Sequence, residues 1–149
     1  MASNNINEDP QFNGILLQTD VDTFNASVES TDSGDVIIRE LTDVNLNSVT
    51  AGDGFIDVVA IGTITATAVS HTTQNETNTI TLIAVGNDSD ILVDSLSTGG
   101  AANIRLIAGD DVNHLANGTT QLITADDLFV LADNPVSYTH LTLPTILLV

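Results

Sequence analysis

The sequence predicts an all-β protein folded as a parallel β-helix (β-solenoid) with about five coils of 20–24 residues each. Hydrophobic residues make up 42% of the chain, and many of them are Ile, Val or Leu, which favour sheet. Dense apolar stretches recur at a nearly constant spacing, and Gly, Asn and Asp gather between them. A helical repeat would instead show apolar spacings of three and four and would favour Ala, Leu, Glu and Lys.

Five apolar stretches define the repeat, and their starts lie 20, 24, 24 and 24 residues apart. A fixed spacing in this range is typical of solenoids, in which each unit stacks on the preceding one. At about 4.8 Å per coil, five coils would form a rod roughly 24 Å long. The stretches begin at Val36 (VIIRE), Ile56 (IDVVA), Ile80 (ITLIA), Ile104 (IRLIA) and Leu128 (LFVLA).

Alignment of the five stretches predicts which side chains face the core. The first and third positions are aliphatic in every unit, as a strand with one buried face requires, whereas the second position is mixed and is therefore expected to face outward. The fifth position is Ala in four units, where a small side chain fits an inward position close to a bend. Glu40 occupies this position in the first unit and predicts an irregular or less enclosed coil there.

The fourth position of the stretches forms a stripe that is mostly aliphatic. Strict alternation would point these side chains outward, as a surface for lateral contact with a neighbouring segment or subunit. The alternative is a kink in each strand that turns both the third and the fourth positions toward the core or a covering loop. The stripe consists of Arg39, Val59, Ile83, Ile107 and Leu131.

A second motif follows the first in three units, as VNLNSVT from Val44, ITATAVS from Ile64 and ILVDSLS from Ile91. It begins 8, 8 and 11 residues after the first motif, so the bend between them absorbs the insertion while both strands keep their pattern. The fourth unit, HLANGTTQLITADD, fits this motif poorly. In that unit Asn117-Gly118 predicts a tight turn and QLIT a short strand.

The charge balance restricts the partners. Sixteen Asp and four Glu oppose two Arg and no Lys, for a net charge of -18, so binding to nucleic acid or to anionic membranes is not expected. The chain has no Cys for disulfides or thiolate metal sites, and no apolar run approaches the roughly 18 to 20 residues that span a bilayer. The expected partners are the flanking coils of a parent protein and further copies that associate laterally.

Composition divides the chain into three regions: an irregular segment at 1–14, the repeat region at 15–134 and a tail at 135–149. The tail contains no acidic residue, and VSYTHLTLPT at 136–145 resembles the in-frame translation of a sequencing adapter. We therefore expect the tail to be non-native and the natural chain to continue beyond Asn134. MASNNINEDP at the start has neither the basic nor the apolar stretch of a signal peptide.

The phrases GDVIIRELTDVNLNSVTAGDG and DILVDSLSTGGAANIRLIAGDDV carry a family resemblance. They resemble the degenerate coils of filamentous-haemagglutinin-like adhesins and other giant repeat-rich bacterial surface proteins, over about residues 15–134. The resemblance implies a right-handed β-helical shaft that is secreted or displayed on the cell surface of a bacterium. It also implies a structural or adhesive role without catalysis.

Acidic bends are the main candidate for a binding site. Calcium takes six to eight oxygen ligands, and the bends GNDSD and AGDD offer Asp88, Asp90, Asp110 and Asp111 as candidate ligands. Asp, Asn, Ser and Gly also favour bends without any metal, through side-chain hydrogen bonds and tolerance of left-handed backbone. A calcium-responsive acidic binding module is therefore the alternative function, and no other cofactor is expected.

A carbohydrate-active β-helix enzyme is the third alternative, and the sequence disfavours it. Lyases of this shape need a basic residue, but Lys is absent and Arg39 and Arg105 occupy different positions of the repeat. A hydrolase would need carboxylates at a fixed separation, which so acidic a chain meets by chance. We assign no catalytic residue, and we expect His71 and His114, which lack regularly spaced partners, to be exposed polar residues.

Overall fold

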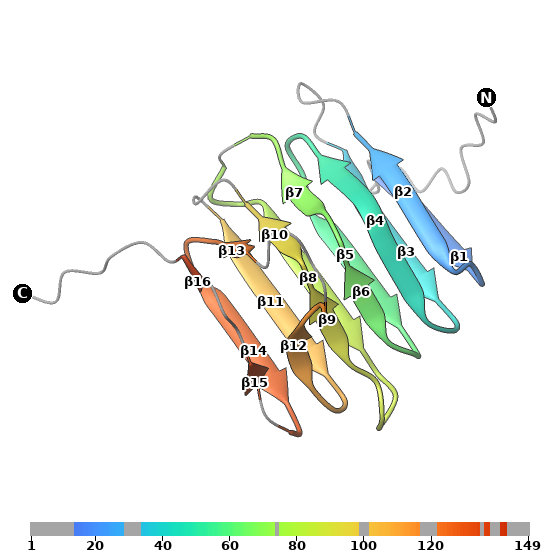
Figure 1. Ribbon diagram of the computed structural model, residues 1–149. Coiled ribbons are helices and arrows are strands. Elements are labelled where there is room, and N and C mark those ends of the chain that lie inside the picture. The colour runs from blue at the N-terminus through green and yellow to red at the C-terminus, as the bar shows by residue number, and fades with distance from the viewer. Residues whose placement is uncertain are drawn as a thin grey trace, which may run out of the picture.

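The computed structural model describes residues 14–28, 34–73, 75–98, 102–116, 122–134, 136–137 and 141–142. Within these ranges the regular structure consists of strands alone, and all strand pairs are parallel. In one of the two sheets the strands stack in chain order from β1 (Gly14–Thr19) to β14 (Leu128–Ala132) (Figure 1). The predicted all-β solenoid is therefore confirmed, while its right-handedness and its number of coils stay predictions.

The first sheet is an unbroken ladder in which each strand pairs with its counterpart one coil earlier and one coil later. Its six strands are β1 (Gly14–Thr19), β3 (Asp35–Glu40), β5 (Ile56–Ala60), β8 (Thr79–Ala84), β11 (Asn103–Ala108) and β14 (Leu128–Ala132). The five predicted starts lie opposite one another, as Val36 with Ile56 and Ile104 with Leu128 show. β1 was not among the five predicted stretches, although its Ile15 pairs with Val36.

The second sheet begins as one long strand and continues as two lines of short strands. The long strand β4 (Val44–Ala51) pairs with β2 (Thr23–Ser27) on one side, and on the other its two halves pair with different strands. One line consists of β6 (Ile64–Ala66), β9 (Ile91–Val93), β12 (Val112–His114) and β15 (Val136–Ser137). The other consists of β7 (Val69–His71), β10 (Ser95–Ser97), β13 (Leu122–Thr124) and β16 (Leu141–Thr142).

The second motif was aligned correctly in its first three units, because Val44, Ile64 and Ile91 lie opposite one another. In the fourth unit the motif begins at Val112, earlier than predicted, and the predicted strand QLIT is present as β13. An insertion between β12 and β13 hides this unit from pattern matching. The predicted turn at Asn117-Gly118 lies outside the described residues.

Two short segments of the 135–149 tail form the strands β15 and β16, which pair with β12 and β13. The non-native origin of the tail stays a prediction.

The core is a continuous column of aliphatic side chains enclosed by the two sheets. The first, third and fifth positions of the apolar stretches that begin at Ile56 in β5 and at Ile80 in β8 are buried, and they alternate with half-buried outward positions. Burial of each Ile or Leu contributes on the order of 1.5 to 3 kcal/mol to folding. Ile37 is an exception: it occupies a second, outward position but is only 3% exposed. The described residues do not show which side chains bury it.

Glu40 corrects one prediction. It pairs in regular register with Ala60 and is only 2% exposed, so the coil is neither irregular nor open at this point. Its carboxylate accepts hydrogen bonds from the Thr19 hydroxyl and from the backbone N–H groups of Leu41 (2.8 Å), Val21 and Thr42 (both 3.3 Å). Burial alone would raise the pKa of Glu40, but these hydrogen bonds together lower it.

Among the described residues there is no helix of the length and apolarity that crossing a bilayer requires.

Candidate metal site

Aspartates at the corners join successive coils. A corner aspartate at the first position of a strand or directly before it accepts a hydrogen bond from the backbone N–H of the residue at the same position one coil later. Three such bonds run from Phe55 N to Asp35 Oδ1 (3.0 Å), from Thr63 N to Asp43 Oδ1 (2.8 Å) and from Asp111 N to Asp90 Oδ1 (3.1 Å). At these positions the carboxylate has a structural role that needs no metal, as a link between successive coils, and the predicted local turn-forming role is not tested by these bonds.

Burial raises the pKa of Asp35, and the hydrogen bond from Phe55 opposes this rise only in part. Asp35 is therefore a partly enclosed structural group, whereas the equivalent carboxylate of Asp43 is exposed.

Three of the four predicted calcium ligands meet at one corner. Asp90 precedes β9, Asp111 precedes β12 one coil later, and Asp110 lies in the bend before Asp111. One carboxylate oxygen from each of the three lies within 4.8 Å of the other two, and all three residues are half-buried. Asp88 is exposed and does not belong to this group.

The polar contacts of this cluster are incomplete. Asn113 Nδ2 donates to Asp111 Oδ2 at 3.3 Å, and Asn134 Nδ2 donates to Asp110 Oδ1. Asp111 Oδ1 is buried and has no hydrogen-bond partner in the part of the chain that the structure describes. An unpartnered buried acceptor costs about 1 to 3 kcal/mol, and nearby like charges add repulsion. A cation bound between the three carboxylates would relieve both costs.

The donor set fits calcium in type but not in number. Carboxylate oxygens suit a hard cation, whereas three Asp side chains supply fewer than the six to eight oxygens calcium takes unless they bind in bidentate fashion or water completes the shell. The backbone is tightly packed beside the cluster. A Cβ added to Gly109 would lie 1.9 Å from the carbonyl oxygen of Gly86, so only glycine fits there.

Both histidines differ from their predicted exposure. His71 ends β7 opposite Ala51, an inward position, and is only 5% exposed, while His114 is half-buried opposite Val93. Both nitrogens of His71 lack a hydrogen-bond partner within the described ranges. The predicted motif ended one position before His71, so the alignment did not show this inward column.

The buried position also changes the acidity of His71. Burial lowers the pKa of His71 to about 4, because the charged imidazolium loses its hydration. The negative charge of the nearby Asp53 carboxylate opposes this fall in the pKa only in part.

Comparison with protein-family models, with curated proteins and with solved structures found no match to this chain. The resemblance to filamentous-haemagglutinin-like proteins and the bacterial surface location therefore stay predictions.

Proposed function

We propose that this chain is a structural or adhesive segment of a large exported bacterial repeat protein, exposed at the cell surface and without catalytic activity. The observation that supports this function is the register of the first sheet, in which equivalent residues of successive coils lie opposite one another from β3 to β14. Further coils can extend such a ladder in the same register, because each coil contacts only its neighbours. A shaft must be extendable in this way to reach a large length.

The outer face of the first sheet supports lateral contact. In β5 and β8 buried and half-buried residues alternate strictly. The alternative in which a kink turns the third and fourth positions both toward the core is therefore wrong for these strands. Val59 and Ile83 face outward and are half-buried. Further along the stripe Leu131 is 53% exposed. At the adjoining corner, exposed aliphatic side chains widen this surface: Leu41 (48%), Ile61 (56%) and Val85 (57%). An exposed apolar surface of this kind is suited to packing against a neighbouring segment or a second copy.

Single-molecule pulling of the full chain from both ends tests the shaft role. Because each coil contacts mainly its neighbours, we expect repeated force peaks separated by one coil of 20–24 residues, or roughly 65 to 85 Å of extended chain. A trace without force peaks would show that the coils bear no load and would overturn the structural role.

Calcium binding is the second candidate function, and the buried, unpartnered Asp111 Oδ1 within the three-aspartate cluster favours it. In this alternative the corner carboxylates repel one another until a cation neutralises them. The enzyme alternative has no comparable support, since Arg39 and Arg105 occupy different columns of the first sheet.

Circular dichroism melts of the full chain in chelator, in millimolar calcium and in sodium chloride of equal ionic strength separate the two candidates. Identical melting temperatures favour the shaft alone. A calcium-specific rise of about 5 to 10 °C would favour the binding module. In that case D111N should abolish the rise, whereas D88N, which removes the same charge at an exposed position outside the cluster, should retain it.

A further inference from the structure

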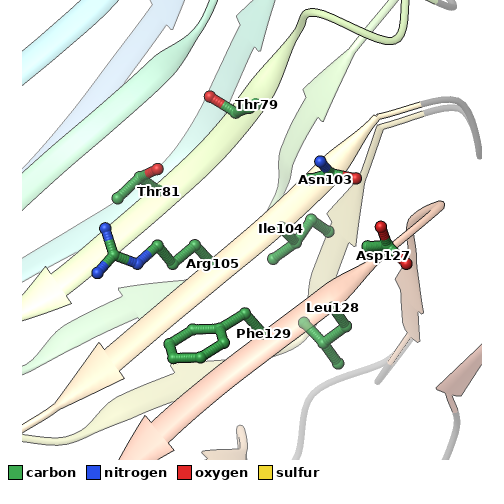
Figure 2. A pocket seen from close by; sticks show the side chains of 8 residues that line it. All are labelled: Thr79, Thr81, Asn103, Ile104, Arg105, Asp127, Leu128 and Phe129. Atoms are coloured by element: carbon green, nitrogen blue, oxygen red, sulfur yellow. The ribbon is translucent and has the colours of Figure 1, made fainter.

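A groove of about 430 Å³ lies on the outer face of the first sheet, across β8, β11 and β14 (Figure 2). One row of its lining places Thr81, Arg105 and Phe129 opposite one another on adjacent strands. A second row contains Thr79 and Asn103 and continues to Asp127, directly before β14. The volume lies within the range of about 300 to 1,000 Å³ that is usual for small-molecule sites.

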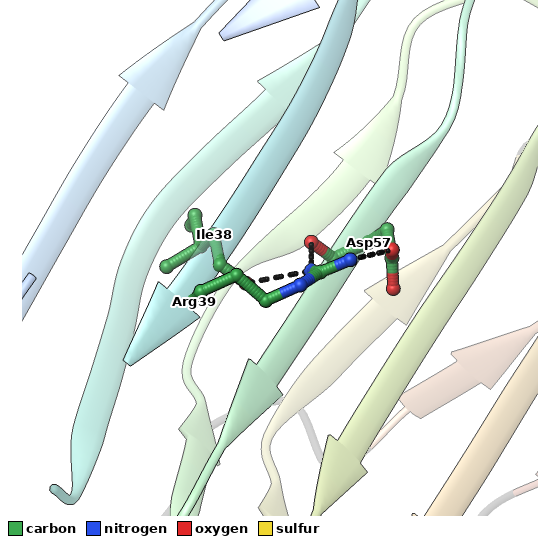
Figure 3. Close-up of polar contacts among 3 residues, drawn as sticks. All are labelled: Ile38, Arg39 and Asp57. Carbon is green, nitrogen blue, oxygen red and sulfur yellow. Dashed lines mark hydrogen bonds and ion pairs between the residues drawn. The ribbon is translucent and has the colours of Figure 1, made fainter. Parts of the chain in front are cut away.

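The two arginines of the chain differ in their availability. Arg105 lies over one face of the Phe129 ring, with its guanidinium carbon 5.7 Å from the ring centroid, and it has no carboxylate partner among the described residues. Arg39 donates to Asp57 Oδ2 at 2.7 Å and to the Ile38 carbonyl at 2.9 Å (Figure 3). The Arg105 donors therefore remain free for a ligand, whereas those of Arg39 are engaged.

The Phe129 ring is the apolar element of the groove. Its side chain is 52% exposed, although burial of an aromatic ring is normally favourable. The ring stands beside hydroxyl, amide, carboxylate and guanidinium groups, which together donate and accept hydrogen bonds. A ligand that matches this surface needs an apolar face for the ring and hydroxyls at its edge that both donate and accept.

We propose that this groove binds a neutral saccharide, with a sugar ring packed on Phe129 and its hydroxyls bonded to Arg105, Asn103 and Asp127. The apolar C–H face and the hydroxyl edge of a pyranose have these properties. An acidic saccharide fits less well, since the net charge of -18 repels anions and Asp127 lies within the groove. This inference extends the adhesive half of the proposed function and names its ligand class, and the pulling experiment does not depend on it.

Saturation-transfer NMR on the full chain tests the proposal with four probes: cellotetraose, maltotetraose, chitotetraose and, as the acidic comparison, tetragalacturonate. We expect transfer to at least one neutral probe, and a rise of about tenfold or more in its Kd for F129A and for R105Q. Leu131 follows Phe129 by two positions on β14 and is equally exposed, so L131A is the matched control for loss of an apolar surface. R39Q is the control for loss of a positive charge.

Circular dichroism confirms that each variant retains its sheet before binding is measured. Unchanged binding in L131A and R39Q, with loss in F129A and R105Q, supports the groove. Transfer to none of the neutral probes overturns the proposal, as do retention of binding in F129A or equal loss in the control variants. Stronger transfer to tetragalacturonate overturns the assignment of a neutral ligand.

Discussion

The central strand β8 and the last long strand β14 carry the same pattern, ITLIA and LFVLA, yet differ in burial. In β8 the inward Ile80 and Leu82 are 0% exposed, whereas in β14 the equivalent Leu128 and Val130 are only half-buried. β8 has β5 on one side and β11 on the other, while β14 pairs only with β11 among the described strands. In this fold the burial of an inward side chain therefore depends on whether a coil lies on both sides of it, as well as on the type and position of the residue.

The largest expected effect follows from this difference. Truncation of Leu82 to Ala removes a side chain enclosed by Val58 and Leu106 in the adjacent strands, so L82A should lower the free energy of unfolding by about 3 kcal/mol. L128A removes the same atoms from a half-buried position and should cost about 1 kcal/mol. Urea unfolding followed by circular dichroism measures both, and equal losses would contradict nearest-neighbour burial.

A second test uses the centre of the other sheet, where β7 lies between β4 and β10 and His71 is buried. The folded-state pKa of His71 is about 4, below the unfolded value of 6.5, so the unfolded chain binds the proton more tightly. The stability that the neutral, buried His71 contributes to the folded chain is present in full above pH 6.5 and is lost as the pH falls toward 4. On the order of 3 kcal/mol of stability should disappear over this window.

The matched variant is H71L, which keeps an apolar volume at this position and cannot titrate. Urea unfolding at a series of pH values should show a smaller loss between pH 6.5 and 4 in H71L than in the unaltered chain, and the difference removes the common contribution of the carboxylates. Parallel curves for the two proteins would show that His71 is not buried as a neutral group.

The smallest effect on stability is expected on the outward side of β8 and β11. Ile83 and Ile107 are half-buried, and Thr favours strands, so each change to Thr should cost below about 1 kcal/mol. Analytical ultracentrifugation of the double variant I83T/I107T should instead show weaker lateral association than in the unaltered chain. A cost near that of L82A, on the same strand, would place Ile83 energetically in the core and remove the support for a lateral surface.

Much of the architecture was predictable because alternation and period are local properties of a sequence. The columns headed by Val36 and Val44 were aligned correctly, since each inward position must be apolar or small and each coil must match its neighbour in register. The missed strand β1 and the fourth unit's Val112 show where this approach fails. Ile15 of β1 lies 21 residues before Val36, within the spacing of the other starts, but its stretch ILLQT has Thr19 in place of the small Ala at the fifth position; in the fourth unit an insertion breaks the spacing.

The candidate site was predictable only in part. Asp90, Asp110 and Asp111 were chosen as residues of acidic bends, but their proximity depends on the stacking of one coil on the next, as does the exclusion of Asp88. The groove around Phe129 was not predicted, because its rows combine residues of three strands about 24 positions apart that a linear pattern records only as a mixed column.

By itself the sequence determined the fold class, the inward columns and the strongly acidic surface, because these follow from residue type and spacing along one strand. Only the tertiary structure decided that Glu40 and His71 are buried, which aspartates meet and which arginine is free. Burial and pairing depend on the side chains that adjacent coils bring to the same corner. Their identity is set by where each loop inserts or omits residues.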